Sequence, residues 1–171
     1  MIYIFDSNVF INLFRNFYRS RFPTLWQKFD AYVESGQIVS VREVLNEIED
    51  RDDQLSKWAK QNRQIFIHPS FEELAFISEI FKVNHFQMLV RTEERLKGKP
   101  VADPFVIAKA KVTQGTVVTD ESLKPNAAKI PNVCEHFGVD CLNLEGFMTP
   151  LKKGQSTELL FGLHGVIFIK A

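Results

Sequence analysis

Acidic residues directly follow two short apolar runs of this sequence. Asp6 ends the run that begins at Met1, and Asp120 and Glu121 follow the segment 116–119. Runs of this kind are typical of strands buried on both faces, which carry the next residue to the rim of a sheet. In open α/β sheets, ligands and chemistry gather at the carboxyl ends of the strands. We therefore expect these acids at one edge of a sheet.

Further acids lie in two expected helices. In the helix 41–50, Glu47 and Glu49 border the apolar stripe, and only a border position can lean into a cleft while its helix packs on the sheet. Helical spacing alone does not choose between them. Asp103 precedes Pro104, which predicts a helix capped by Asp103 with Pro104 as its first residue. A functional role for Asp103 is compatible with this cap.

Each acid also has a purely structural interpretation. Asp6 or Ser7 could cap the following helix, and Asp120 with Glu121 could form a polar turn. Taken together, however, these acids could converge on one end of a parallel sheet. Two unit charges at 4 Å repel by about 4 kcal/mol at an effective dielectric near 20, so such a cluster requires cations. Hard oxygen ligands without His or Cys suit Mg²⁺ or Mn²⁺, which promote hydrolysis of phosphodiesters.

The elements that must position these acids alternate along the chain. Helical patterns cover 9–17, 23–36, 41–50, 52–62, 71–81, 86–96, 103–111 and 130–137, and strand patterns cover 1–5, 37–41, 65–67, 116–119 and 139–144. Strands alternating with helices predict an α/β fold, with a mostly parallel sheet covered by helices on both faces.

The bulk composition is that of one globular domain. The chain has 171 residues, 45% of them hydrophobic, and 21 basic residues balance 21 acidic ones. Zero net charge weakens any claim of strong non-specific nucleic-acid binding, although a local basic patch remains compatible with it. The 16 Phe residues predict an aromatic core or an apolar interface. Residues 150–171 differ in character and could form an edge strand, an interface element or an added extension.

The two cysteines and the absence of long apolar runs bear on location. Cys134 and Cys141 have no CxxC spacing and no accompanying His cluster, so we expect buried free thiols and no zinc. No run approaches the length of a membrane span, and the N-terminus lacks a basic segment followed by a long apolar one. We therefore expect a cytoplasmic protein without membrane contact.

Four segments, taken in order, resemble the PIN-domain family of metal-dependent ribonucleases. They spread over most of residues 1–145 and read Ile4-Phe5-Asp6-Ser7-Asn8, Val44-Leu45-Asn46-Glu47-Ile48, Asp103-Pro104-Phe105-Val106-Ile107-Ala108-Lys109-Ala110 and Val117-Val118-Thr119-Asp120-Glu121. The resemblance implies a three-layer α/β/α sandwich over residues 1–149 and Mg²⁺- or Mn²⁺-dependent cleavage of RNA. It also implies, for a prokaryotic protein, frequent service as the toxin of a VapC-like toxin–antitoxin pair.

The family's functional positions carry over one residue at a time. Asp6, Glu47 and Asp103 match its three core metal-site acids, so the resemblance favours Glu47 over Glu49. Asn8 and Thr119 match its usual polar neighbours of the site. The family often has Thr-x-acid, which would choose Glu121 as the fourth acid, whereas Asp120 directly follows Thr119. Both remain candidates, and residues 150–171 match nothing in the family.

The expected partners follow from the same interpretation. An RNA substrate needs cations along its backbone, and the candidates are Arg15, Arg19, Arg21, Lys97, Lys99, Lys109 and Lys111. The resemblance implies an antitoxin protein as a second partner. The Phe-rich composition and the apolar tail predict either capture of that antitoxin or formation of a homodimer through exposed apolar surface.

Two other functions compete with the ribonuclease. A phosphatase with an aspartyl nucleophile at Asp6 typically needs a second Asp two positions later, and this chain has Asn8 there, which is a poor acid or base. A PIN-like module that binds RNA or protein without turnover is the stronger alternative. The acids argue against it, but metal-site acids can persist in an idle domain.

Overall fold

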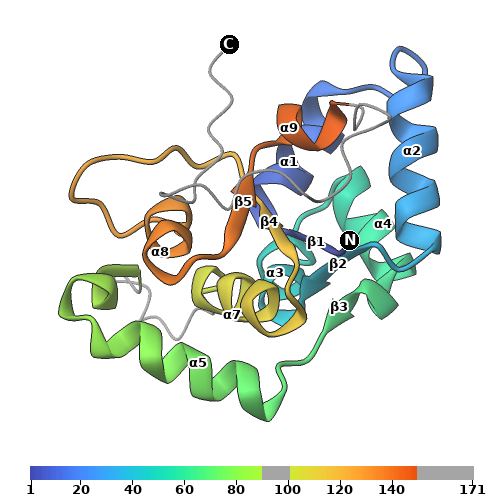
Figure 1. The fold of residues 1–171 in the computed structure, drawn as a ribbon. Helices are drawn as coiled ribbons and strands as arrows, with labels where there is room; N and C mark the ends of the chain where they lie inside the picture. Colours follow the sequence, from blue (N-terminus) through green and yellow to red (C-terminus); the bar gives the residue numbers. More distant parts are fainter. Residues whose placement is uncertain (90–100, 150–171) are drawn as a thin grey trace.

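A five-stranded sheet runs through the centre of the molecule. In the computed structural model, which describes residues 1–89 and 101–149, all neighbouring strands are parallel and their order is β3-β2-β1-β4-β5 (Figure 1). The strands are β1 (Tyr3–Phe5), β2 (Ile38–Val41), β3 (Phe66–Ile67), β4 (Thr116–Val118) and β5 (Asp140–Leu142). In this register, the central residue Ile4 pairs with Val39 on one side and Val117 on the other. The carboxyl ends of all five strands therefore share one edge.

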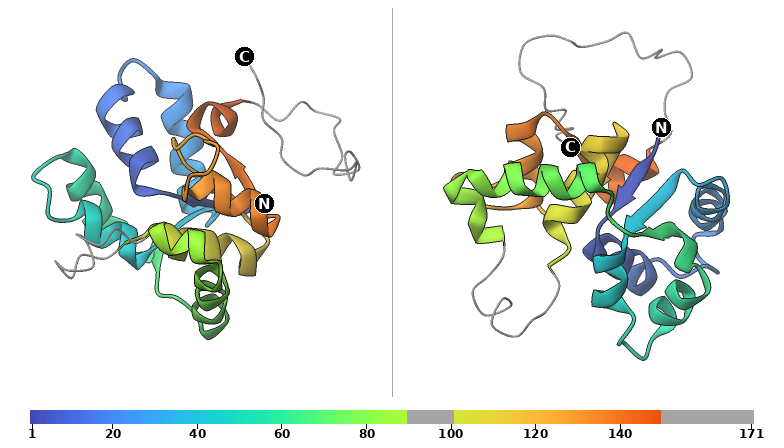
Figure 2. Two further views of the ribbon diagram at one scale, coloured as in Figure 1. Left: turned by 90° about the vertical axis from the view of Figure 1, so that its left-hand side faces the viewer. Right: turned by 90° about the horizontal axis from the view of Figure 1, so that it is seen from below.

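Helices cover both faces of this sheet. One face carries α1 (Ser7–Asn16) and α2 (Pro23–Glu34), and α3 (Arg42–Ile48) and α4 (Gln54–Gln61) contact α1 (Figures 1 and 2). The other face carries α7 (Asp103–Thr113), with α5 (Phe71–Lys82) and α8 (Ile130–Phe137) packed against it. This is the three-layer α/β sandwich predicted from the alternation of elements.

The remaining elements are short. They are the 3₁₀ helices η1 (Arg63–Ile65) and η2 (Asn84–Leu89) and the final helix α9 (Leu144–Met148). Helix α9 packs beside α2, because Lys28 Nζ donates to the Phe147 carbonyl oxygen over 2.6 Å. The Phe147 ring also meets Tyr3 and Phe5 of β1 edge-on, with centroids 5.2 and 5.0 Å away.

Aromatic side chains fill the core under α1–α4. Phe5, Phe10 and Phe29 are fully buried, and Trp58 packs against Phe10 and Phe29 with centroid distances of 5.5 Å. These tilted and edge-to-face contacts are the arrangements that aromatic rings prefer. Much of the high Phe content thus goes into one core, as the composition predicted.

The sequence misplaced three details of this framework. The helix expected over 86–96 is the 3₁₀ helix η2 as far as Leu89, and its later part lies outside the described residues. The last strand ends at Leu142, and the missed helix α9 follows because Asn143 caps it by accepting from Gly146 N at 2.8 Å. The cap expected at Asp103 is wrong: Ala102 occupies the cap position and Asp103 is already helical.

Two further expectations can be compared with the described residues. Cys134 and Cys141 are both free thiols, but only Cys134 is buried, whereas Cys141 is half-buried. Among residues 1–89 and 101–149, no helix combines the length and apolar character needed to cross a membrane. The tail 150–171 lies outside the described residues.

Candidate active site at the carboxyl edge of the sheet

Asp6 lies where β1 ends and α1 begins. Its backbone N–H donates to the Val118 carbonyl oxygen at 3.0 Å, which continues the pairing of β1 with β4 by one residue. Its side chain is the N-cap of α1, with Oδ1 accepting from Ser7 N at 2.7 Å. Only 3% of Asp6 is exposed. The residue is therefore a helix cap and, at the same time, a buried carboxyl group at the carboxyl edge of the sheet.

A polar network joins Asp6 to the end of β4. The Thr119 hydroxyl donates to Asp6 Oδ2 at 3.0 Å and accepts from Asn8 Nδ2 at 3.1 Å. Asn8 Oδ1 in turn accepts from the Asp120 N–H at 2.9 Å. Because Asn8 ties the first turn of α1 to the residues after β4, the network fixes the direction of both carboxyl-bearing segments.

Burial and like charges give Asp6 an unusual titration. They raise its pKa from an ordinary 3.8 to about 7, with burial as the largest cause and the neighbouring charges of Glu47 and Glu121 adding to it. Hydrogen bonds from Ser7 and Thr119 act in the opposite direction, because they stabilise the charged form. These donors are neutral, and their combined effect on the pKa of Asp6 is smaller than that of burial and the neighbouring carboxylates.

Glu47 and Glu49 point to different surroundings. Glu47 is exposed, and its Oε1 accepts from the Ala102 N–H at 3.1 Å, immediately before Asp103. Its charge also acts on Asp6. Glu49 instead pairs with Arg63 at 2.9 Å. The tertiary contacts thus separate two residues that helical spacing left equivalent.

Asp103 is the first residue of α7 and is half-buried. The bond between Glu47 and Ala102 brings the start of α7 next to α3, although the two segments are 55 residues apart in the chain. Three of the predicted acids are therefore linked: the charge of Glu47 acts on Asp6, and Glu47 accepts a hydrogen bond from the residue before Asp103.

The two candidates for the fourth acid have different partners. Asp120 accepts from Asn12 Nδ2 at 2.7 Å and from Leu144 N at 3.3 Å, so it joins α1 to the start of α9. Glu121 is half-buried, and its charge raises the pKa of Asp6. Lys129 Nζ lies 3.0 Å from Glu121 Oε1, and Ile130 N donates to Oε2 at 2.9 Å.

These contacts bear on whether the acids fit a cation. Within the described ranges, no three His, Cys, Asp or Glu side chains are gathered closely enough to hold a metal ion as they stand. Glu47 and Glu121 instead use their oxygens on backbone N–H groups and, for Glu121, on Lys129. The chemistry of the donors nevertheless fits a hard divalent cation. Asp6 is a buried carboxyl group whose neighbours are carboxylates, and a cation would reverse the effect that raises its pKa.

The basic residues predicted to contact RNA differ in exposure and in their partners. Lys109 is only 5% exposed and forms an ion pair with the buried Glu73 at 2.7 Å, so the prediction that it contacts RNA is wrong. Arg19 pairs with Asp30 at 2.6 Å, and its guanidinium lies 4.0 Å above the Trp26 ring. Lys111 donates to the Phe137 carbonyl oxygen. Arg15 and Arg21 are exposed, and Lys97 and Lys99 lie outside the described residues.

Three contributors to this edge were missed in the sequence. Lys129 and the Ile130 N–H hold Glu121, and the buried Ser40 hydroxyl donates to the Phe5 carbonyl oxygen at 2.6 Å, just before Asp6. Ser40 could have been noticed as a polar residue inside an otherwise apolar strand. Lys129 had no such signal, since its role depends on how the loop after β4 folds back.

Comparison with known proteins gives a family and one likeness of shape. The family model described as "Domain of unknown function (DUF4411)" matches residues 3–153. No curated protein matches the chain. Among solved structures, the chain is similar to one described as "Crystal structure of VapBC2 from Rickettsia felis bound to a DNA fragment from their promoter", with 16% identity and a TM-score of 0.46. The match covers 84% of this chain and 98% of that one.

Proposed function

The chain belongs to the DUF4411 family, and we propose that it is a metal-dependent endoribonuclease whose active site is built around Asp6. The observation that carries this proposal is the burial of the Asp6 carboxyl group at the carboxyl end of β1, where the charges of Glu47 and Glu121 add to burial in raising its pKa. An uncompensated acid of this kind is characteristic of functional sites rather than of structural ones. The ordered sequence motifs that resemble PIN-domain ribonucleases point to the same residues.

The assignment of roles follows the contacts. Asp6, Glu47, Asp103 and Glu121 would hold Mg²⁺ or Mn²⁺, which when bound activates water and stabilises in-line displacement at phosphorus. Thr119 and Asn8 orient Asp6, since the Thr119 hydroxyl donates to its Oδ2 and accepts from the Asn8 amide. We assign Glu121 to the metal site because its charge acts on Asp6, and Asp120 to positioning because it joins α1 to α9 through Asn12 and Leu144. The nuclease domain comprises residues 1–149 in this proposal.

Cleavage assays on a charge-removing variant test the proposal. Asp6→Asn keeps the side-chain shape and the cap, because Asn and Asp cap helices equally well. Loss of an outer partner of a metal site already costs about 10- to 100-fold, so loss of a ligand should reduce Mn²⁺-dependent cleavage by at least about a hundredfold. The substrate would be an end-labelled single-stranded RNA that contains all sixteen dinucleotide steps.

Asp50→Asn is the matched control. It makes the same chemical change at an exposed acid beyond the end of α3, so its cleavage rate should equal that of the parent. Cleavage retained in Asp6→Asn would contradict the proposal. A parent protein that binds RNA but leaves it intact with Mn²⁺ or Mg²⁺ would instead favour the non-catalytic binding module.

We further propose that the protein acts as the toxin of a toxin–antitoxin pair. Apart from the sequence motifs, this rests on apolar side chains left exposed on α5, where Phe71 is 85% and Leu74 is 47% exposed. Such residues at i and i+3 on one helix offer a surface for a partner or a second copy. Induced expression of the parent should arrest bacterial growth, whereas Asp6→Asn should not. Normal growth with an active enzyme would contradict the toxin role but leave the ribonuclease intact.

A further inference from the structure

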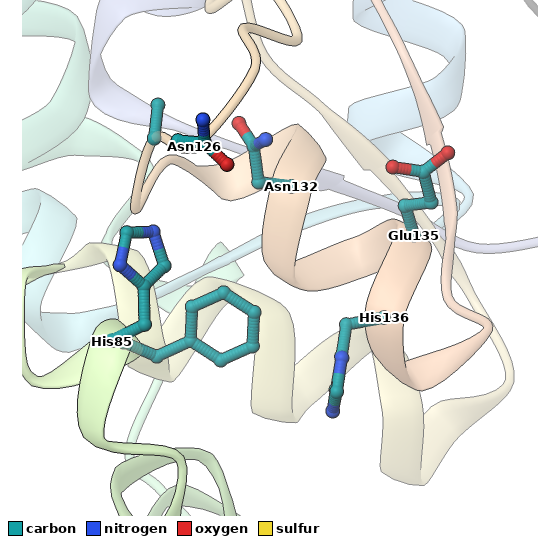
Figure 3. Close-up of a pocket in the computed structure, with 7 residues that line it drawn as sticks. His85, Asn126, Asn132, Glu135 and His136 are labelled. Atoms are coloured by element: carbon teal, nitrogen blue, oxygen red, sulfur yellow. The ribbon is translucent and has the colours of Figure 1, made fainter.

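An open hollow lies between α8, the loop after β4 and η2. Its volume is about 430 Å³, within the range of small-molecule sites. His85, Asn126 and Asn132 line it, and Figure 3 shows their side chains converging from these three segments. His136 also lines the hollow, but its ring points away from the two asparagines.

Two buried polar atoms at this hollow lack partners. They are Nε2 of His85 and Oδ1 of Asn132, and neither has a hydrogen bond to any part of the chain that the structure describes. The orientation of the Asn132 amide is fixed, because its Nδ2 donates to the Lys124 carbonyl oxygen at 2.8 Å. Buried polar groups are nearly always satisfied, by protein, water or a ligand, so two unmet atoms in residues that line one hollow mark a place where a ligand would find hydrogen-bond partners.

Ring contacts hold the two walls together. Phe86, which follows His85 in η2, packs edge-on against His136 of α8 with centroids 5.1 Å apart and lies 6.2 Å from Phe137. Because Phe86 is buried, η2 is anchored on α8 independently of any occupant. The hollow is therefore preformed, and Phe86 belongs both to its lining and to the contact between its walls.

The same loop connects this hollow to the carboxyl edge of the sheet. Glu121 begins it, and Ile130 N, at the start of α8, donates to Glu121 Oε2 at 2.9 Å. Asn132 stands two residues further and holds the loop through Lys124. The loop thus contributes both to the carboxyl edge of the sheet and to the wall of the hollow.

We infer that the hollow bounded by His85, Asn126 and Asn132 is a nucleobase subsite, which receives an unstacked base of the RNA next to the scissile bond. This inference deepens the proposed ribonuclease function and rests on it. Sequence-dependent recognition of RNA generally works on unstacked bases, through hydrogen bonds to their edges and contacts with aromatic side chains.

The two unmet atoms select for this chemistry. Asn132 Oδ1 is an acceptor, so the ligand must present an N–H or O–H there, and a bare phosphate is disfavoured. A neutral imidazole nitrogen can donate or accept, so His85 Nε2 pairs with the atom adjacent to that donor. The edge of a nucleobase carries such donors and acceptors side by side, and its flat ring suits an open hollow whose lining includes the Phe86 ring.

Binding of single nucleotides tests the inference without any cleavage. The full chain, in the presence of a chelator, would be titrated separately with the 5′-monophosphates of adenosine, cytidine, guanosine and uridine. Ribose 5-phosphate is the probe that lacks a base. At least one nucleotide should bind about tenfold more tightly than ribose 5-phosphate.

A pair of matched variants locates the bound base. His85→Phe keeps a ring but removes Nε2, and it should weaken nucleotide binding about tenfold. His68→Phe makes the same change at an exposed residue after β3 and should leave binding unchanged. Asn126 has a left-handed backbone with φ 55°, so Asn126→Gly removes its amide without strain and should also weaken binding. Thermal melts would check that each variant is folded.

Equal binding of the nucleotides and ribose 5-phosphate would overturn the inference, as would full nucleotide affinity in both His85→Phe and Asn126→Gly. These outcomes are separate from failure of the ribonuclease proposal, because binding is measured without metal. If the parent cleaves RNA, His85→Phe should reduce its preference between bases while leaving Mn²⁺ dependence unchanged. If cleavage is absent but a base binds at His85, the ribonuclease proposal fails and the subsite stands.

Discussion

Two acids of this protein are equally buried and have opposite surroundings. Asp6, at the carboxyl edge of the sheet, and Glu73, between α5 and α7, are each 3% exposed. Glu73 has Lys109 at 2.7 Å, itself only 5% exposed. Asp6 has neutral hydrogen-bond donors and two further carboxylates.

The difference shows which buried charge serves the fold. At Glu73 the chain supplies the compensating cation through Oε1, so the pair joins two helices, although Glu73 Oε2 has no hydrogen-bond partner in the part of the chain that the structure describes. At Asp6 the chain supplies repulsion, and the compensating charge must be either a proton or a bound cation. Burying a carboxylate near other carboxylates costs free energy. Such a buried carboxylate at the end of a parallel strand therefore marks the proposed site.

The largest expected effect is a loss of stability when the ion pair between Lys109 and Glu73 is broken. Lys109→Met leaves Glu73 buried and unpaired and should lower the free energy of unfolding by about 3–5 kcal/mol. Replacing both partners, as Lys109→Met with Glu73→Leu, should restore most of that loss. Chemical denaturation would measure both. Lys111→Met, at an exposed lysine of the same helix, is the control, and an equal loss there would remove the contrast with Asp6.

Removing the charge of Asp6 should stabilise the metal-free protein, whereas removing the charge of Lys109 should destabilise it. Folding raises the pKa of Asp6 from 3.8 to about 7, so the folded state holds a proton that the unfolded state releases, and metal-free stability should fall between about pH 4 and 7. The difference corresponds to about 4 kcal/mol above pH 7. Asp6→Asn should abolish this loss and melt higher than the metal-free parent at pH 8, but not at pH 4. A lower melting temperature at pH 8 would contradict an uncompensated charge.

Binding of a divalent metal ion should reverse the order of the melting temperatures of the parent and Asp6→Asn. Binding to the folded state alone stabilises a protein by about 2.7 kcal/mol when the ion is present at a hundred times its dissociation constant. Mn²⁺ should therefore raise the melting temperature of the parent and leave that of Asp6→Asn unchanged. An equal rise in both would place the bound ion elsewhere than at Asp6.

Thr119→Val tests how much a neutral hydrogen-bond donor stabilises the charged form of Asp6. It retains the side-chain shape but removes the hydroxyl that donates to Asp6 Oδ2, a bond to a charged group that contributes about 1.5–3 kcal/mol. Without it, the pKa of Asp6 should rise further, and the loss of metal-free stability should shift to higher pH. Thr113→Val is a suitable control, since its hydroxyl donates within α7 to the Lys109 carbonyl oxygen. An unshifted profile in Thr119→Val would contradict a contribution of the Thr119 hydroxyl to the pKa of Asp6.

The smallest effect separates the two candidates for the fourth acid. Glu121→Gln removes a like charge that acts on Asp6, so the pKa of Asp6 should fall, whereas Asp120→Asn should leave it unchanged. The pH at which metal-free stability declines would report the difference. A larger change in Asp120→Asn would reverse the assignment of the metal-site and positioning acids.

Much of this edge was predictable from local sequence. The apolar run before Asp6 predicted a buried strand and the apolar spacing after it predicted a helix, so the turn between them had to bring Asp6 to the rim. Burial of β1 and the position of Asp6 as both rim residue and cap bear this out. The Asn143 cap and helix α9 were also local features, but the β-branched and apolar residues before Leu144 favoured a longer strand.

Other features depend on residues that are far apart in the chain. Glu47 and Glu49 are equivalent in the periodicity of α3, and only the return of the chain at Ala102 and the position of Arg63 separate them. Lys109 resembles a surface lysine in sequence, but α5 places Glu73 against it. His85 and Asn132 carry no motif, and they face one hollow only because Phe86 packs on α8.

The alternation of elements and the acids at their ends follow from local sequence, because strand and helix periodicity act over a few residues. Which charges are compensated depends instead on contacts between distant segments. Lys109 forms an ion pair with Glu73, and Lys129 forms one with Glu121. Asp6 is instead subject to the like charges of Glu47 and Glu121. The physical reason is that electrostatic energy depends on distance and burial in space, and α5, the loop after β4 and the start of α7 come together only when the chain folds.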